Sequence, residues 1–308
     1  MELWEKFYES NAVPENFEIS KQKLKDFSKK HVNSRIVVVT SGGTIVPLEH
    51  NTVRFVDNFS AGTRGAASTE YFLESGYAVV FLYRLKSVEP FVRHFSGRTF
   101  LDKLEIINKD VENQGIQVKK DSINQILPVI KAYKSAVNED KLLCLGFTSL
   151  ADYLWLLRAI CQQIADHGNL AMFYLAAAVS DFYIPASDMP VHKLQSGDGI
   201  PTVSFQLVPK MLKPLVALWV PKAFVVSFKL ETNEDILISK ARSSLEAYHH
   251  KLVIGNLLQS RRTKVILVTA DSQTLIEMSK AEIEQGLEIE KKIVLSVIQL
   301  HSNFSSFS

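Results

Sequence analysis

Four glycines early in the chain lie where its backbone could approach a phosphate. Of the 13 glycines, Gly42, Gly43, Gly62 and Gly65 all fall between positions 42 and 65. Ser60, Gly62 and Gly65 lead into a predicted helix, whose free N–H groups and positive dipole end favour an anion. Gly42 and Gly43 would let a second stretch of backbone approach the same ligand. Ordinary turn glycines beside a capped helix remain the alternative.

The spacing of these glycines excludes the two best-known nucleotide motifs. Gly62-Thr63-Arg64-Gly65 comes long after the strand predicted to end at Thr40, whereas the dinucleotide fingerprint follows its strand directly. No Gly-Lys-Ser/Thr follows, which excludes a Walker A loop. A nucleotide at these glycines would therefore be bound in another manner.

Other polar residues follow predicted strands, and each has a plain alternative. Asp181 could contact a ligand, but it could equally cap a turn or a helix. Lys193 lies in a polar stretch and could be a solvated surface lysine. Lys229 could simply pair with the nearby Glu231. The eight histidines show no metal-ligand spacing, and no Ser-His-Asp set is evident.

The pattern of apolar runs predicts one large α/β domain over 1–308. Buried strands at 35–40 and 78–83 flank a helix at 65–75, which is a parallel crossover unit. Further strands are predicted at 142–146, 171–179, 203–208, 223–228, 252–255 and 265–268, and helices at 123–137, 149–165, 234–250 and from Ser279 to about 300.

These elements predict a doubly wound, mostly parallel open sheet with helices on both faces, a Rossmann-like α/β fold. Ligands of such sheets bind beyond the carboxyl ends of the strands, where the glycines and Asp181 would lie. Residues 1–34 are expected to form an N-terminal helical segment. Residues 85–141 are expected to be a variable insert or lid.

Composition excludes several classes of protein. With 46% hydrophobic residues the chain can bury a full core, and a net charge of +2 is too balanced for general binding to nucleic acid. No signal peptide or membrane span is expected, so a cytoplasmic location is predicted. Cys144 and Cys161 stand in apolar contexts and are expected to be buried free thiols.

Five motifs together resemble one enzyme family. They are V-T-S-G-G-T-x-V-P-L-E from Val39, V-R-F-x-D-N-F-S-x-G-x-R-G from Val53, A-M-F-Y-L-A-A-A-V-S-D-F-Y from Ala171, H-K-L-Q-S from His192 and S-F-K-L-E-T from Ser227. In this order and spacing they are similar to the phosphopantothenoylcysteine synthetases of the stand-alone eukaryotic type. The resemblance runs from about Arg35 to the last predicted helix.

The resemblance implies a ligase of coenzyme A biosynthesis. Members of this family join 4′-phosphopantothenate to L-cysteine through an acyl-nucleotidylate, releasing pyrophosphate and then the nucleoside monophosphate. ATP is the expected nucleotide, with CTP possible because bacterial relatives use it. Mg²⁺ is expected with the triphosphate, without identified ligands. The family is homodimeric, so a homodimer is expected.

The resemblance also assigns roles to individual residues. Arg54 would reach the neighbouring subunit's phosphopantothenate, Asn58 would hold the reacting acyl group, and Lys193 would stabilise charge. Lys193 is the one lysine retained where bacterial relatives have K-x-K-K. The remaining assignments are a substrate site of Ala177, Ala178 and Asp181, together with Asn58 and Arg54, and a nucleotide site of Gly42, Ser60, Gly62, Gly65, Phe228 and Asn256.

Two alternatives remain open. One is a non-catalytic nucleotide-binding relative that keeps the fold. The other is an NADP-dependent oxidoreductase, because Arg84 and Lys86 follow the second strand where a 2′-phosphate could bind. The missing glycine fingerprint counts against the oxidoreductase.

Overall fold

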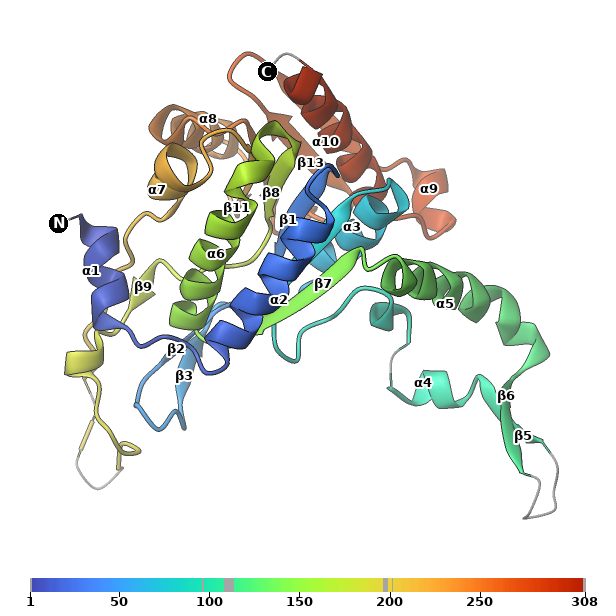
Figure 1. The fold of residues 1–308 in the computed structure, drawn as a ribbon, viewed down its shortest axis with the longest axis horizontal. Helices are drawn as coiled ribbons and strands as arrows, with labels where there is room; N and C mark the ends of the chain where they lie inside the picture. The colour runs from blue at the N-terminus through green and yellow to red at the C-terminus, as the bar shows by residue number, and fades with distance from the viewer. Residues whose placement is uncertain (1, 96, 108–113, 196–198, 201, 307–308) are drawn as a thin grey trace.

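A twisted eight-stranded sheet forms the centre of the computed structural model, which describes residues 2–95, 97–107, 114–195, 199–200 and 202–306 (Figure 1). Its strand order is β14-β13-β12-β11-β8-β1-β4-β7. Neighbours from β7 to β12 are parallel, whereas β13 and β14 are antiparallel. This arrangement confirms the predicted doubly wound, mostly parallel sheet.

The main sheet consists of β1 (Ile36–Ser41), β4 (Ala78–Arg84), β7 (Leu142–Phe147), β8 (Ala171–Leu175), β11 (Phe224–Glu231), β12 (Leu252–Leu257), β13 (Lys264–Val268) and β14 (Gln273–Glu277). Three small hairpins lie outside it: β2 (Ile45–Pro47) with β3 (Phe55–Asp57), β5 (Leu104–Ile107) with β6 (Gly115–Val118), and β9 (Phe182–Tyr183) with β10 (Gln206–Leu207).

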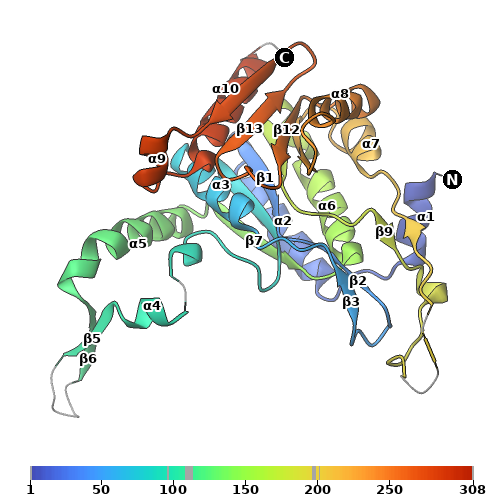
Figure 2. The ribbon, with the colours of Figure 1, turned by 180° about the vertical axis from the view of Figure 1, so that it is seen from behind.

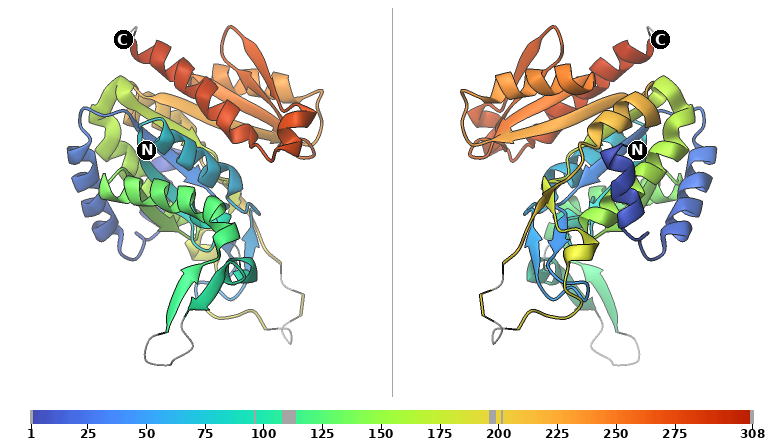
Figure 3. Two further views of the ribbon diagram at one scale, coloured as in Figure 1. Left: turned by 90° about the vertical axis from the view of Figure 1, so that its right-hand side faces the viewer. Right: turned by 90° about the vertical axis from the view of Figure 1, so that its left-hand side faces the viewer.

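Helices cover both faces of the sheet (Figures 2 and 3). The helices are α1 (Leu3–Ser10), α2 (Phe17–Lys30), α3 (Thr63–Glu74), α4 (Gly97–Leu101), α5 (Ile123–Asn138), α6 (Leu150–Ile164), α7 (Leu212–Pro214), α8 (Leu237–Tyr248), α9 (Lys280–Glu284) and α10 (Ile289–Ser306). One core layer joins the sheet to α1, α2 and α6, and the other joins it to α3 and α10.

The central strand β1 explains this layering. All six of its residues are buried, as expected for a strand covered on both faces. Because side chains alternate along a strand, Val37 and Val39 join the α3 and α10 layer, while Ile36 and Val38 join the other. A continuous apolar run therefore gives a rigid strand whose carboxyl end is fixed in place.

Two predicted strands differ from the observed ones. The strand predicted at 171–179 ends at Leu175, because Ala178 leaves the ladder to bond the backbone of Gly42 and Thr44. The strand predicted at 203–208 is outside the main sheet and contributes only the short β10. In both cases an apolar or alternating pattern extended beyond the strand itself.

The last predicted helix is two helices. The Ser279 capping box is present, with Glu282 bonded back to the Ser279 N–H at 2.7 Å. The chain then turns at Gly286, whose φ of +70° ends α9 before α10 begins.

The cysteines differ in their environments. Cys161 is buried on α6, as predicted, but Cys144 is exposed. The prediction for Cys144 was wrong because β7 is an edge strand without a neighbour on one side. Both thiols are free, and no helix of the described residues is long and apolar enough to cross a membrane.

Candidate functional site

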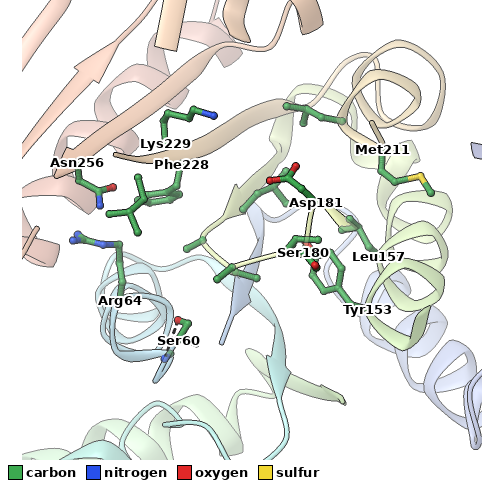
Figure 4. Close-up of a pocket in the computed structure, with 18 of the residues that line it drawn as sticks. Ser60, Arg64, Tyr153, Leu157, Ser180, Asp181, Met211, Phe228, Lys229 and Asn256 are labelled. Carbon is green, nitrogen blue, oxygen red and sulfur yellow. Dashed lines mark hydrogen bonds between the residues drawn. The ribbon is translucent and has the colours of Figure 1, made fainter. Parts of the chain in front are cut away.

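A cavity of about 760 Å³ opens where the strand order reverses (Figure 4). From β1 the chain first builds β4 and β7 on one side, and later β8 and β11 on the other. Loops from the two halves diverge at this point, which leaves a crevice at the carboxyl ends of the strands. The wall includes residues 59–64 before and within α3, 175–181 from the last residue of β8 onward, and 208–212.

Backbone hydrogen bonds join three of the predicted site residues beside this cavity. The Ala178 N–H donates to the Gly42 carbonyl at 2.8 Å, and the Thr44 N–H donates to the Ala178 carbonyl at 3.0 Å. The Asn58 N–H donates to the Thr44 carbonyl at 3.1 Å. A Cβ at Gly43 would lie 1.6 Å from the Asn58 carbonyl oxygen, so only glycine permits this approach.

The N-terminus of α3 is arranged to receive an anion. Its first N–H groups have no side-chain cap, because the N-cap is Gly62 with φ +81°. The first turn has no acidic residue and contains Arg64. Ser60, Gly62 and Arg64 all line the cavity. Uncapped N–H groups and a basic first turn favour an anion, and the phosphate site expected from the sequence stays a prediction.

Gly65 lies differently from its neighbours. A Cβ there would lie 2.4 Å from Ser41 Oγ and 2.5 Å from Ser41 Cβ, so the glycine lets α3 pack tightly onto β1. Neither Gly65 nor Gly42 lines the cavity. Their predicted nucleotide contacts stay predictions, and the structure gives both a packing role.

One end of the cavity combines an aromatic ring, an amide and a guanidinium, from Phe228, Asn256 and Arg64 (Figure 4). Arg64 lies over the Phe228 ring, 5.9 Å from its centre, and Arg64 Nη1 is 3.2 Å from Glu290 Oε1. Asn256 is 6% exposed beside them. Burial raises the pKa of Glu290, and the Arg64 charge opposes this. Such an end suits a flat ring with polar edges.

The other end is more apolar and carries one accessible carboxylate (Figure 4). Tyr153 and Leu157 from α6 face Met211, with Ala177 nearby in the wall. Asp181 forms an exposed ion pair with Lys210 at 3.0 Å. The charged residues of the whole wall are five basic and two acidic: Arg64, Lys210, Lys229, Arg261 and Arg262, against Asp181 and Glu290. This balance suits anionic ligands.

Arg54, Asn58 and Lys193 are not in the wall of this cavity. Arg54 precedes β3, and its Nη1 donates to Glu49 Oε1 at 2.9 Å and to the Leu194 carbonyl at 3.0 Å. Lys193 is exposed directly before Leu194. The structure thus brings Arg54 next to the Lys193 segment, outside the cavity of its own chain.

Sequence reasoning missed two groups at the site. Arg64 lies within a motif used for the resemblance, yet its partner Glu290 comes from α10 and carries no local signal. Glu49 is the last residue of the first motif, yet nothing in the sequence indicates that it is fully shielded from solvent beneath Arg54. Only tertiary contacts identify these acids.

Two further expectations can be compared with the geometry. Arg84 Nη1 donates to the Gly43 carbonyl and to Asp57 Oδ1, both at 2.8 Å, so this side chain ties β4 to the segments around Gly43 and Asp57. Its expected contact with a 2′-phosphate stays a prediction. No described residue of the 85–141 segment lines the cavity, and its β5–β6 hairpin stands away from the sheet (Figure 1). Its predicted role as a lid stays a prediction.

Comparison with known proteins identifies clear relatives. Residues 156–296 match the family described as DNA/pantothenate metabolism flavoprotein C-terminal domain. Human phosphopantothenate–cysteine ligase is 47% identical over 88% of this chain and 87% of the human protein. The CAB2 ligase of Saccharomyces cerevisiae is 40% identical over 99% of this chain and 87% of its own length.

A solved structure agrees with these relatives over nearly the whole chain. A Cab2 mutant in complex with phosphopantothenate-cysteine superposes with a TM-score of 0.87 at 40% identity, covering 98% of this chain and 99% of that one. The matches to the human and yeast ligases thus cover 88% and 99% of this chain. The chain therefore belongs to the phosphopantothenate–cysteine ligase family.

Proposed function

We propose that this protein joins 4′-phosphopantothenate to L-cysteine in coenzyme A biosynthesis, with ATP as the activating nucleotide. The observation that carries the proposal is the cavity at the switch point. One end offers the uncapped α3 N-terminus beside Phe228 and Asn256, and the other offers Ala177 and Asp181. A nucleotide and a second anion could therefore meet within one space, in a chain of this family.

The chemistry proceeds in two balanced steps. A carboxylate oxygen of phosphopantothenate attacks the α-phosphorus of ATP, forming an acyl-adenylate and releasing pyrophosphate. The cysteine amine then attacks the acyl carbon, AMP departs with the electron pair of the broken C–O bond, and the amine loses a proton. Adenylation is needed because a free carboxylate is a poor electrophile. Binding both anions side by side provides the proximity that this reaction requires.

Charge stabilisation would come from residues around the acyl group. We assign Asn58 as a neutral hydrogen-bond donor to the reacting acyl oxygen, and Lys193 as the cation that balances charge developing there. The short backbone path from Asn58 through Thr44 to Ala178 supports this placement. Ala177 and Ala178 would let the backbone come close to the substrate.

Mg²⁺ would enter with the triphosphate. The described residues contain no group of three His, Cys, Asp or Glu side chains that could hold a metal ion. Mg²⁺ usually keeps several waters and binds through substrate phosphates and few carboxylates. Asp181, with its side chain 70% exposed, is the accessible acid of the cavity wall and fits such a role.

A homodimer would complete the site. Arg54 is exposed and outside its own chain's cavity, and β3 directly after it exposes Phe55 and Val56. Apolar side chains grouped in this way are typical of an interface. We propose that Arg54 crosses this interface to the phosphate of the partner's substrate, for which a guanidinium fork is well suited.

Product analysis tests the proposed reaction. Purified protein with phosphopantothenate, cysteine, Mg²⁺ and ATP should release AMP and pyrophosphate in equal amounts, and should do so less efficiently with CTP. Release of ADP and phosphate instead would contradict the adenylate mechanism. Nucleotide binding without any turnover would favour the non-catalytic alternative.

A further inference from the structure

The Glu49 carboxylate is a buried charge with an unusually complete set of partners. Its side chain is 0% exposed. Oε2 accepts from the N–H groups of Val53 and Arg54 at 3.3 and 2.9 Å. Oε1 accepts from Arg54 Nη1 at 2.9 Å and from the Leu194 N–H at 3.4 Å. Burying a carboxylate is costly unless it is bonded in this way.

The two oxygens serve different parts of the chain. Oε2 closes the local turn before β3, whereas Oε1 joins the Arg54 guanidinium to a segment about 140 residues further along. Arg54 completes the link by donating to the Leu194 carbonyl at 3.0 Å. Leu194 is therefore held at both its N–H and its C=O, directly after Lys193.

Backbone contacts reinforce the same junction. The His50 N–H donates to the Pro190 carbonyl at 2.9 Å, and the Asn51 N–H donates to the Val191 carbonyl at 3.2 Å. The turn at 48–54 and the segment at 190–195 thus dock along several residues. We call this junction the Glu49 clasp: Glu49, Arg54 and Leu194 with these backbone pairs.

The clasp leaves part of Arg54 available. Of its guanidinium nitrogens, only Nη1 takes part in the hydrogen bonds found among the described residues, and the side chain is 42% exposed. Nε and Nη2 form another edge of the planar fork and can donate together to a phosphate. A guanidinium already held on one side loses less conformational entropy when it binds.

The backbone N–H of Arg54, together with its guanidinium and the other N–H donors, holds the pKa of the Glu49 carboxyl below its usual range. The acid therefore stays ionised at neutral pH and keeps accepting from all four donors. A glutamine could not do so, because one of its two terminal atoms is a donor.

We propose that Glu49 is a positioning residue, whose buried carboxylate holds Arg54 and the Lys193–Leu194 segment in one arrangement and so presents both cations to the same phosphopantothenate. This inference rests on the proposed function. It adds that Arg54 and Lys193 of one chain act together on one phosphopantothenate, whether that substrate is bound by the same subunit or by its partner.

The test separates positioning from simple turn formation. We would measure kcat, the KM for phosphopantothenate and the KM for ATP in the wild-type protein, Glu49→Gln, Glu49→Asp, Arg54→Ala and Glu49→Gln with Arg54→Ala. Glu246→Gln, on the exposed surface of α8, is the matched control. Thermal unfolding of each variant reports the structural cost.

Glu49→Gln should raise the KM for phosphopantothenate about tenfold, as for loss of one charge-assisted contact, and leave the KM for ATP within about twofold. Glu49→Asp keeps the negative charge, so its KM for phosphopantothenate should lie between those of the wild-type protein and Glu49→Gln. It is the variant to compare if Glu49→Gln does not fold. In a protein that already carries Arg54→Ala, adding Glu49→Gln should change the KM for phosphopantothenate little further.

Equal changes in both KM values, or an undiminished effect of Glu49→Gln without Arg54, would overturn the inference while leaving the ligase activity established. An inactive wild-type protein would instead remove the proposed function, and the inference with it. The two failures are therefore distinguishable.

Discussion

At the scale of single residues, the early glycines perform distinct tasks. Gly43 lets the Asn58 carbonyl pass within 1.6 Å of where a Cβ would be, and Gly65 lets α3 approach Ser41. Gly62 instead starts α3 in a left-handed conformation and leaves its N–H groups uncapped. Two of these glycines therefore build the frame, and the third faces the cavity.

Asn58→Asp places a negative charge where we assign a neutral donor. We expect kcat to fall by about a hundredfold or more, as for loss of an oxyanion donor, with a further penalty from repulsion of the acyl oxygen. Within the described part of the chain, the hydrogen bond found for Asn58 joins main-chain atoms, so the melting temperature should change little. Steady-state kinetics and thermal unfolding give both quantities.

Asn303→Asp is the control for this change, because Asn303 is exposed on α10. It introduces the same charge far from the cavity and should leave kcat unchanged. Wild-type turnover in Asn58→Asp would exclude Asn58 from the reacting centre.

At the scale of elements, α10 is attached to the body through a buried histidine. His301 Nδ1 lies 2.8 Å from the Tyr77 hydroxyl, and His301 Nε2 lies 2.9 Å from the Asn169 carbonyl. These partners assign the proton to Nε2, with Tyr77 donating to Nδ1. Because α10 also supplies Glu290 to the cavity, this attachment supports the site from the outer layer.

Burial lowers the pKa of His301 to about 4. The unfolded chain takes up a proton near pH 6.5, whereas the folded protein does not, so the free energy of unfolding falls as the pH falls through this window. The free energy of unfolding of the wild-type protein should fall between pH 7 and pH 5, and in His301→Gln this fall should be smaller by about 2 kcal/mol. Urea unfolding at the two pH values measures it.

His249→Asn provides the comparison, since His249 is exposed and its φ of +56° suits asparagine. That variant should keep the wild-type pH dependence. A slope in His301→Gln equal to that of the wild-type protein would show that His301 does not contribute to the acid sensitivity.

At the scale of the whole molecule, the position of Arg54 matters most. It is outside the cavity of its own chain, and we propose that it serves a partner's substrate. In a symmetric dimer each site would then combine Asn58 of one subunit with Arg54 of the other. This arrangement can be tested without any structure of the complex.

A heterodimer of one Arg54→Ala subunit and one Asn58→Asp subunit should have one intact site of two. Purified through two different tags and assayed at a phosphopantothenate concentration at which each homodimer turns over slowly, it should show about half of wild-type activity. No recovery in the heterodimer would place Arg54 on the substrate of its own chain.

The Glu49 clasp extends this experiment to Lys193. If Arg54 and Lys193 serve the same substrate across the interface, a heterodimer of Arg54→Ala and Lys193→Ala subunits has one defect in each site. It should remain as inactive as the homodimers. Recovery to about half of wild-type activity would show that the two cations serve different sites.

The sequence by itself determined the doubly wound sheet and the family. Local patterns of apolar residues indicate the buried strands and amphipathic helices. The order and spacing of the five motifs indicate the family. The apolar run after Ala171 extends beyond the strand end at Leu175, because such a run does not show where a strand leaves its ladder. The single helix predicted from Ser279 is interrupted at Gly286, whose positive φ ends α9.

Only the tertiary structure decided which charges meet. Glu290 reaches Arg64 from α10, and Leu194 reaches Glu49 across about 140 residues. Such contacts depend on how layers and loops pack, and no local spacing encodes them. In the sequence Glu49 is the last residue of the first motif, and no local pattern indicates its burial. Its burial beneath Arg54 makes it the residue that connects two segments of the proposed substrate site.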